Sequence, residues 1–158
     1  MCGFLFLVHQ NRTIDKNQFT KMGDLLQHRG PDNTSNFFIN EKIGLNVSRL
    51  RIHDKTSSSD QPFKSECGRY IILFNGAIFN FKKLKKELES SGESFSTISD
   101  TEVLLKGYLK YGNNFFYKIN GMYAIAIFDN LNLKLNVFRD FSGIKPVYYF
   151  HSGETLII

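Results

Sequence analysis

The chain has 158 residues and carries 20 Lys and Arg against 15 Asp and Glu, which leaves a formal net charge of +5. This length supports one hydrophobic core without disulfides and is too short for two large domains, so residues 1–158 are predicted to form a single domain. The 42% hydrophobic and 22% charged content excludes disordered, collagen-like and coiled-coil proteins. No stretch reaches the roughly 18 apolar residues of a membrane span, so we expect no membrane partner.

Cysteine usage indicates a reducing compartment. Cys2 and Cys67 form neither a CxxC pair nor a cluster with histidines, so we predict no disulfide framework and no metal site. The apolar N-terminus lacks a basic region and a small-residue cleavage site, which argues against a signal peptide. We therefore expect a cytoplasmic protein.

The positive charge raises the alternative of a nucleic-acid-binding domain. The basic residues are spread along the chain, however, and the densest group, Lys82-Lys83-Lys85-Lys86, is followed by Glu87 and Glu89. A solvated helix face explains that group better, so no nucleic-acid partner is expected. The salt dependence of any binding would discriminate the two interpretations.

Apolar periodicity and end signals predict three helices. The first covers residues 15–28 and ends at Gly30-Pro31-Asp32. The second covers 81–91, with Asn80 as its cap and Gly92 after its end. The third begins at Ser99-Asp100-Thr101-Glu102, a capping-box pattern, and ends before Gly112. The apolar face predicted for the first helix consists of Phe19, Met22, Leu25 and Leu26.

The remaining apolar runs predict strands, which outnumber the helices. Links between strands after residue 120 are short, which favours antiparallel pairing and an α+β fold over a parallel α/β sheet. Residues 122–128 are almost continuously apolar, so we expect that strand to be covered on both faces, as in two packed sheets with helices outside. The predicted strands are residues 2–9, 36–39, 43–50, 70–75, 122–129, 133–139, 147–150 and 155–158.

Cys2 is the most informative single residue. A cysteine at the start of a strand is ordinarily a small buried hydrophobe. Removal of Met1, however, would leave Cys2 with a thiol and a free α-amine on one residue. A terminal amine has a reference pKa near 7.7–8.0, so it can accept the thiol proton, directly or through a water. The position therefore predicts a nucleophile that carries its own base.

Asn75-Gly76 lies at the end of the strand predicted at residues 70–75. One interpretation is a tight Asn-Gly hairpin turn. The alternative is functional: the side-chain amide of Asn75 and the backbone N–H of Gly76 could both donate to a developing oxyanion. One such donor contributes about 2.7–4 kcal/mol of transition-state stabilisation.

Arg49 and Asp100 together would suit the zwitterionic head of an amino acid. The planar guanidinium of Arg49 can bind a carboxylate with two hydrogen bonds. Asp100, at the predicted start of a helix, could hold an ammonium group. The structural alternatives are a surface ion pair of Arg49 with Asp54 or another acid, and charge–dipole stabilisation or capping of the helix by Asp100.

Motifs along nearly the whole chain resemble those of class II glutamine amidotransferase domains, which are N-terminal nucleophile (Ntn) hydrolases. The motif sequences are most similar to those of the glutaminase domain of asparagine synthetases. Each motif is weak alone, but together they follow the family's order. They are Met1-Cys2-Gly3, HRGPD at residues 28–32, RLRIHD at 49–54, NGAIFN at 75–80, SDTE at 99–102, GMYA at 121–124 and RDFSGIKPVYY at 139–149.

The resemblance implies a four-layer αββα sandwich of two mainly antiparallel sheets. It also implies a catalytic role for three residues. Cys2 would be the nucleophile after Met1 is removed, and Asn75 with Gly76 would form the oxyanion hole. The thiolate would attack the side-chain amide of L-glutamine, release ammonia and leave a glutamyl thioester for water to hydrolyse.

Substrate binding is implied in the same way. Arg49 would bind the glutamine carboxylate and Asp100 its ammonium group, while backbone at Leu50 and Ile52 would line the site. Ala77 departs from the pattern, because asparagine synthetases usually carry a glutamate there that helps to hold the substrate head group. This departure bears on glutamine affinity more than on the chemistry.

The resemblance also implies a partner. Asparagine synthetases continue into an ATP-dependent domain that uses the ammonia, and this chain contains no SGGxDS pyrophosphate motif. We therefore expect no cofactor in residues 1–158, with ATP and Mg²⁺ confined to a synthetase domain or subunit. The alternative is a catalytically silent glutamine-binding or scaffold module of the same fold.

Overall fold

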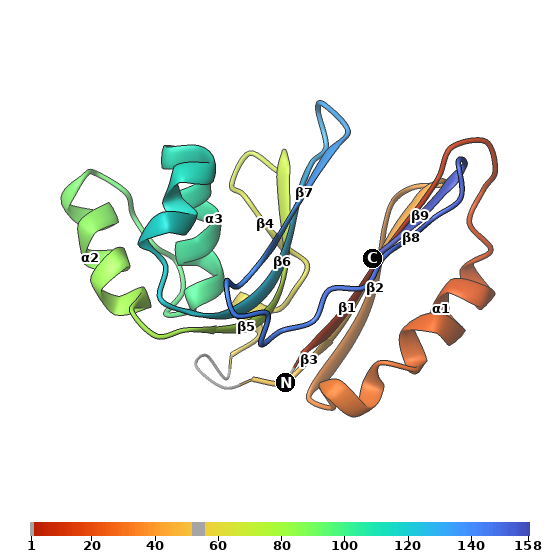
Figure 1. Ribbon diagram of the computed structural model, residues 1–158, viewed down its shortest axis with the longest axis horizontal. Helices are drawn as coiled ribbons and strands as arrows, with labels where there is room; N and C mark the ends of the chain where they lie inside the picture. Colours follow the sequence, from red (N-terminus) through yellow and green to blue (C-terminus); the bar gives the residue numbers. More distant parts are fainter. Residues whose placement is uncertain (1, 52–55) are drawn as a thin grey trace. The chain divides into compact units, whose positions relative to one another are not determined.

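The computed structural model describes residues 2–51 and 56–158 (Figure 1). The described chain divides into two compact units, which we call the terminal unit (Met1–Leu50 with Pro146–Ile158) and the central unit (Arg51–Lys145). Each unit holds an antiparallel sheet with helices. The predicted α+β class and antiparallel pairing are therefore confirmed. None of the helices in the described part of the chain is long and apolar enough to cross a membrane.

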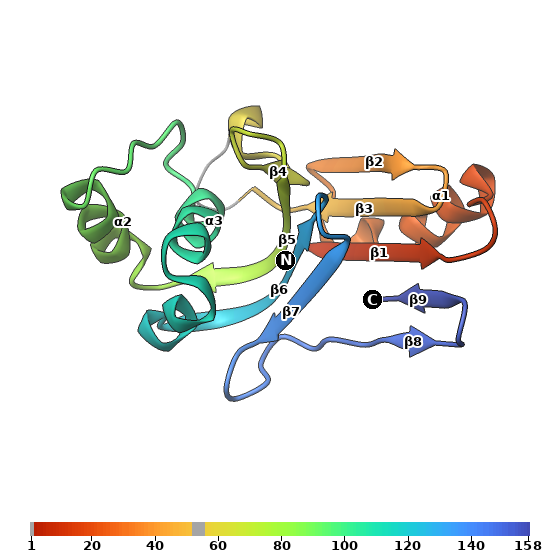
Figure 2. The same ribbon diagram turned by 90° about the horizontal axis from the view of Figure 1, so that it is seen from above.

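The terminal unit is built on a sheet whose strand order is β2-β3-β1-β9-β8 (Figure 2). Strand β3 is buried along its whole length, and helix α1 packs against the sheet through Phe19, which belongs to a buried cluster with Leu5, Leu7 and Ile14. The bounds of the elements are β1 Gly3–His9, α1 Lys16–Asp24, the 3-10 helix η1 Gln27–Arg29, β2 Asn33–Asn40, β3 Ile43–Arg49, β8 Phe150–His151 and β9 Thr155–Ile157.

Helix α1 is shorter than the predicted 15–28. Asp15 is its N-cap, with a carboxylate that accepts from the N–H groups of Asn17 and Gln18. After Asp24 the backbone changes to tighter i→i+3 hydrogen bonds. Leu26 N–H donates to Gly23 O, and in η1 Arg29 N–H donates to Leu26 O. Leu25 consequently points into solvent with 74% of its surface exposed, so its assignment to the apolar face was wrong.

The central unit has a sheet of strand order β4-β5-β6-β7, with α2 and α3 on one face (Figure 1). Side chains of β5 and β6 form its core with Leu84, Leu88 and Leu104 of those helices. Every residue from Tyr123 to Asp129 is buried, as the apolar run predicted. The bounds of the elements are η2 Ser57–Ser59, β4 Phe63–Lys64, β5 Tyr70–Ile78, α2 Phe81–Ser90, α3 Asp100–Tyr111, η3 Gly112–Lys118, β6 Gly121–Asp129 and β7 Lys134–Arg139.

Two local predictions hold only in part. Asn80 is the N-cap residue of α2, as predicted, but its side chain makes no capping bond; its carboxamide donates to Lys118 O (2.9 Å) and accepts from Asn120 N–H (3.0 Å), which joins it to the loop before β6. The strand predicted at 147–150 is reduced to Phe150–His151 in β8, because only those residues pair with β9.

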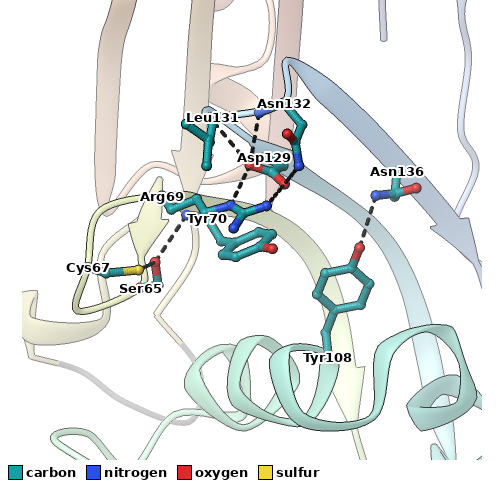
Figure 3. A network of polar contacts seen from close by, with 9 residues as sticks. All are labelled: Ser65, Cys67, Arg69, Tyr70, Tyr108, Asp129, Leu131, Asn132 and Asn136. Atoms are coloured by element: carbon teal, nitrogen blue, oxygen red, sulfur yellow. Dashed lines mark hydrogen bonds and ion pairs between the residues drawn. The ribbon is translucent and has the colours of Figure 1, made fainter.

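A polar network fastens one end of the central sheet (Figure 3). The guanidinium of Arg69 donates to both carboxylate oxygens of Asp129, at 2.8 and 2.6 Å, and thereby joins the start of β5 to the end of β6. These bonds hold the pKa of the Asp129 carboxyl well below its usual range and raise that of Arg69. Nearby, Asn136 of β7 donates to the Tyr108 hydroxyl of α3 at 3.0 Å.

Candidate active site

In the terminal unit, Cys2 lies against the backbone of Leu50. Gly3 pairs with Ser48 in the β1–β3 ladder, so the residue before β1 meets the residues just after β3. Leu50 N–H donates to the Cys2 sulfur at 3.4 Å, and the thiol faces Leu50 O at 3.7 Å. Cys2 is half-buried and forms no disulfide.

Arg49 is the last residue of β3 and is 5% exposed. The suggested partner Asp54 lies outside the described residues, so the ion pair considered from sequence stays a prediction. The HRGPD turn packs directly on this strand end. A Cβ on Gly30 would collide with backbone atoms of Ser48 and Arg49, so only glycine fits there. Asp32 N–H also donates to Arg49 O at 3.2 Å.

The structure thus brings Cys2, Arg49 and Leu50 together at one end of β3. Ile52, the other residue predicted to line the site through its backbone, lies outside the described residues.

In the central unit, Asn75, Gly76 and Ala77 lie inside β5 and pair with Ala124, Tyr123 and Met122 of β6. The hairpin-turn interpretation of Asn-Gly was therefore wrong. Glycine has a packing reason at position 76, because a Cβ would collide with the Met122 carbonyl oxygen of the neighbouring strand. Ala77, which pairs with Met122, is half-buried.

The backbone N–H of Gly76 lies on the edge of β5 that faces away from β6. Successive residues of an antiparallel strand direct their N–H and C=O groups to alternate sides. Tyr123, opposite Gly76, uses its N–H and C=O toward Asp140 on the β7 side, which leaves Gly76 directed to the other edge of β5. On that edge β4 is paired with Ile71 and Ile72, and no strand of the described chain faces Gly76.

The side chain of Asn75 lies on the opposite face of the sheet from Phe74, whose ring packs in the helix-covered core. Asn75 is 7% exposed. Its Oδ1 atom is buried, and the residues that the structure describes give it no hydrogen-bond partner. A buried amide oxygen without a hydrogen-bond partner is unusual in a protein interior and is consistent with an acceptor held for a ligand.

Asp100 is the first residue of α3 and is buried. Its Oδ2 atom accepts from Ile78 N–H at 3.1 Å, which brings the SDTE and NGAIFN motifs together. The residue that caps α3 is the neighbouring Ser99, because its Oγ accepts from Thr101 N–H at 3.1 Å. Asp100 therefore combines an anchored oxygen with a position at the positive end of a helix.

Sequence reasoning missed the role of Glu102. The capping-box pattern predicted a return bond to Ser99. Instead, its carboxylate accepts from the N–H and hydroxyl of Ser96, at 3.0 and 3.1 Å, and from those of Thr97, both at 2.7 Å. Ser99 N–H donates to the Thr97 hydroxyl at 3.2 Å. Glu102 consequently orders the loop that leads into Asp100.

Across residues 2–51 and 56–158, no three His, Cys, Asp or Glu side chains form a group that could hold a metal ion.

Comparison with known proteins places these residues in a family. A family model described as "Glutamine amidotransferase domain" matches residues 1–158. Asparagine synthetase (glutamine-hydrolyzing) 1 of Bacillus subtilis is 39% identical over 153 residues, which cover 94% of this chain and 24% of that protein. Putative asparagine synthetase (glutamine-hydrolyzing) 2 of Methanocaldococcus jannaschii is 34% identical over 174 residues, covering 99% and 33%. The chain therefore belongs to the glutamine amidotransferase domain family.

The fold is shared with a solved amidotransferase. The glutamine phosphoribosylpyrophosphate amidotransferase of B. subtilis, determined with ADP and GMP, superposes with a TM-score of 0.75 at 22% identity. The match covers 98% of this chain and 41% of that one. The chain likewise spans only about a quarter to a third of the length of the two synthetases compared above.

Proposed function

We propose that this chain is the glutaminase domain of an asparagine-synthetase-like amidotransferase, which hydrolyses L-glutamine to glutamate and ammonia for an ATP-dependent synthetase. The observation that carries the proposal is the contact of Cys2 Sγ with Leu50 N–H beside the buried Arg49. The two curated relatives compared are both named glutamine-hydrolyzing synthetases, which favours an enzyme over a silent scaffold.

The first chemical step requires Met1 to be removed. The α-amine of Cys2 then takes the thiol proton, and the thiolate attacks the side-chain carbonyl carbon of glutamine. A carbon–sulfur bond forms, and the carbonyl electron pair moves to oxygen. Asn75 and Gly76 are the proposed donors to that oxyanion. The open strand edge at Gly76 supports this role.

The second step releases ammonia. Collapse of the tetrahedral species breaks the carbon–nitrogen bond, and the protonated α-amine returns its proton to the leaving nitrogen. A glutamyl thioester remains on Cys2. Water, deprotonated by the same amine, attacks the thioester, and loss of the thiolate yields glutamate and regenerates the enzyme.

Recognition of the amino-acid head is assigned to opposite charges. The Arg49 guanidinium would bind the α-carboxylate and the Asp100 carboxylate the α-ammonium. Because each step moves only protons and an acyl group, the proposal requires no cofactor in residues 1–158. ATP and Mg²⁺ would serve the synthetase that consumes the ammonia.

The test is the stoichiometry of products formed by the purified chain. We expect glutamate and ammonia in equal amounts, with turnover abolished and glutamine binding retained in Cys2→Ala. Cys67→Ala is the matched control, because Cys67 is an exposed thiol on the loop before β5, and it should retain turnover. Full turnover by Cys2→Ala would overturn the proposal.

A further inference from the structure

Gln61 makes an unusual pair with the backbone of β5. Its side chain is buried, with 4% of the residue exposed. The Nε2 group donates to Phe74 O at 3.0 Å, and the Oε1 atom accepts from Phe74 N–H at 2.6 Å. A side-chain amide therefore satisfies both backbone groups of the residue that immediately precedes Asn75.

The register of the sheet explains why a side chain is needed there. In the β4–β5 ladder, Phe63 pairs with Ile72, so continuing the antiparallel register places Gln61 opposite Phe74. β4 begins only at Phe63, so the strand itself does not reach Phe74. The carboxamide of Gln61 carries the same donor and acceptor as a peptide group, and it extends the pairing where the strand does not.

The same edge of β5 is held again at Ile78, whose N–H donates to Asp100. Gly76 lies midway between these two anchored positions. Its N–H shares their edge, because residues 74, 76 and 78 point their backbone groups to the same side of the strand. The edge is therefore fixed on either side of the position proposed to receive the oxyanion.

We propose that Gln61 is a positioning residue for the glutaminase reaction: by pairing with Phe74 it fixes the direction of the Gly76 N–H and of the Asn75 carboxamide. This inference rests on the proposed function, because it assigns Gln61 an effect on the oxyanion donors. Gln61 itself does not touch substrate. Its influence should therefore fall on kcat, since oxyanion donors act mainly in the transition state.

The first test is Gln61→Met, which keeps the length of the side chain and removes both hydrogen-bonding groups. A misplacement of about 1 Å can cost about 10²-fold in rate, so we expect kcat to fall by about 10–100-fold with KM within about 2-fold of wild type. Gln18→Met, an exposed glutamine on α1, is the matched control and should leave both constants unchanged. A wild-type kcat in Gln61→Met, or an equal loss through KM, overturns the proposal.

The second measurement is hydrogen–deuterium exchange, which does not depend on turnover. We expect faster exchange at Phe74 N–H in Gln61→Met, while core amides such as Ile125 stay protected and show that the variant is folded. Unchanged protection at Phe74 overturns the pairing itself. If the wild-type chain lacking Met1 shows no glutaminase activity, the proposed function fails separately, and the exchange result still decides whether Gln61 holds this strand.

Discussion

The carboxylate of Asp100 accepts a hydrogen bond from the backbone N–H of Ile78 at 3.1 Å. The first residue of α3 is thereby joined to the end of the strand that carries Asn75 and Gly76. An acid proposed to bind the substrate ammonium also steadies the backbone proposed to bind the oxyanion. Substitutions in either motif should therefore affect binding and turnover in different proportions, and the split between KM and kcat is informative.

Asn75→Ala should lower kcat by about 10²–10³-fold, because it removes one donor to the oxyanion. KM should change little, since the ground-state carbonyl needs that donor less. Steady-state kinetics with glutamine would measure both constants. Asn114→Ala, an exposed asparagine in η3, is the control. A wild-type kcat in Asn75→Ala would refute the assignment.

Arg49→Lys should raise KM for glutamine by about 10–100-fold, because a point charge replaces a planar fork that can bind a carboxylate twice. The change preserves charge, so loss of electrostatic attraction alone would not explain the result. Binding can be checked independently by calorimetry on Cys2→Ala. Arg12→Lys, on an exposed loop, should bind glutamine normally. Unchanged affinity in Arg49→Lys would count against the carboxylate role.

Glu102→Gln should lower stability and loosen the loop before Asp100. The neutral amide presents an NH₂ group to donors that now face a carboxylate oxygen, and hydrogen bonds to a charged acceptor contribute about 1.5–3 kcal/mol. We expect a Tm lower by several degrees and a higher KM with a smaller change in kcat. Glu66→Gln is the control, because Glu66 is exposed and pairs with Lys106 at the surface. A variant with wild-type Tm and KM would show that this network does not position Asp100.

Asp140 should make stability depend on pH. Burial raises the pKa of its carboxyl, but N–H donors from Lys145, Ile144 and Tyr123 more than offset this, so the pKa lies below its ordinary 3.8. The stabilisation is then present in full above about pH 4 and is lost as the pH falls through the lowered value. Asp140→Asn should therefore reduce Tm at about pH 7 and approach wild type at about pH 2.5.

Thermal unfolding at both pH values would measure the effect. Asp24→Asn, which alters an exposed carboxylate at the end of α1, should follow wild type throughout. A difference between Asp140→Asn and wild type that is the same at both pH values would contradict the carboxylate explanation.

Much of the fold could be predicted because apolar periodicity and end signals are local. The apolar run that ends at Phe128 predicted β6, and Gly112 predicted the end of α3. Predictions failed where a distant partner decides the outcome. Residues 76–78 are strand because β6 lies beside them. That partner cannot be seen in a local window.

The candidate site residues were proposed as chemical types, since thiol, guanidinium, amide and carboxylate would each suit one part of glutamine. The supporting residues could not. Gln61 next to a proline and Glu102 in a capping box have ordinary local explanations, and their partners are found only in three dimensions. The described structure brings Arg49 to Cys2 within the terminal unit and Asp100 to the NGAIFN strand within the central unit.

The central claim is that Cys2 acts as an N-terminal nucleophile, and removal of Met1 tests it most directly. Chain that retains Met1 would be treated with a methionine aminopeptidase, and intact mass and glutamate formation would be followed on the same samples. The account predicts that turnover appears in proportion to the loss of Met1 and is absent from Cys2→Ala treated alike. Turnover that is already complete before Met1 is removed, or absent after its complete removal, would contradict it.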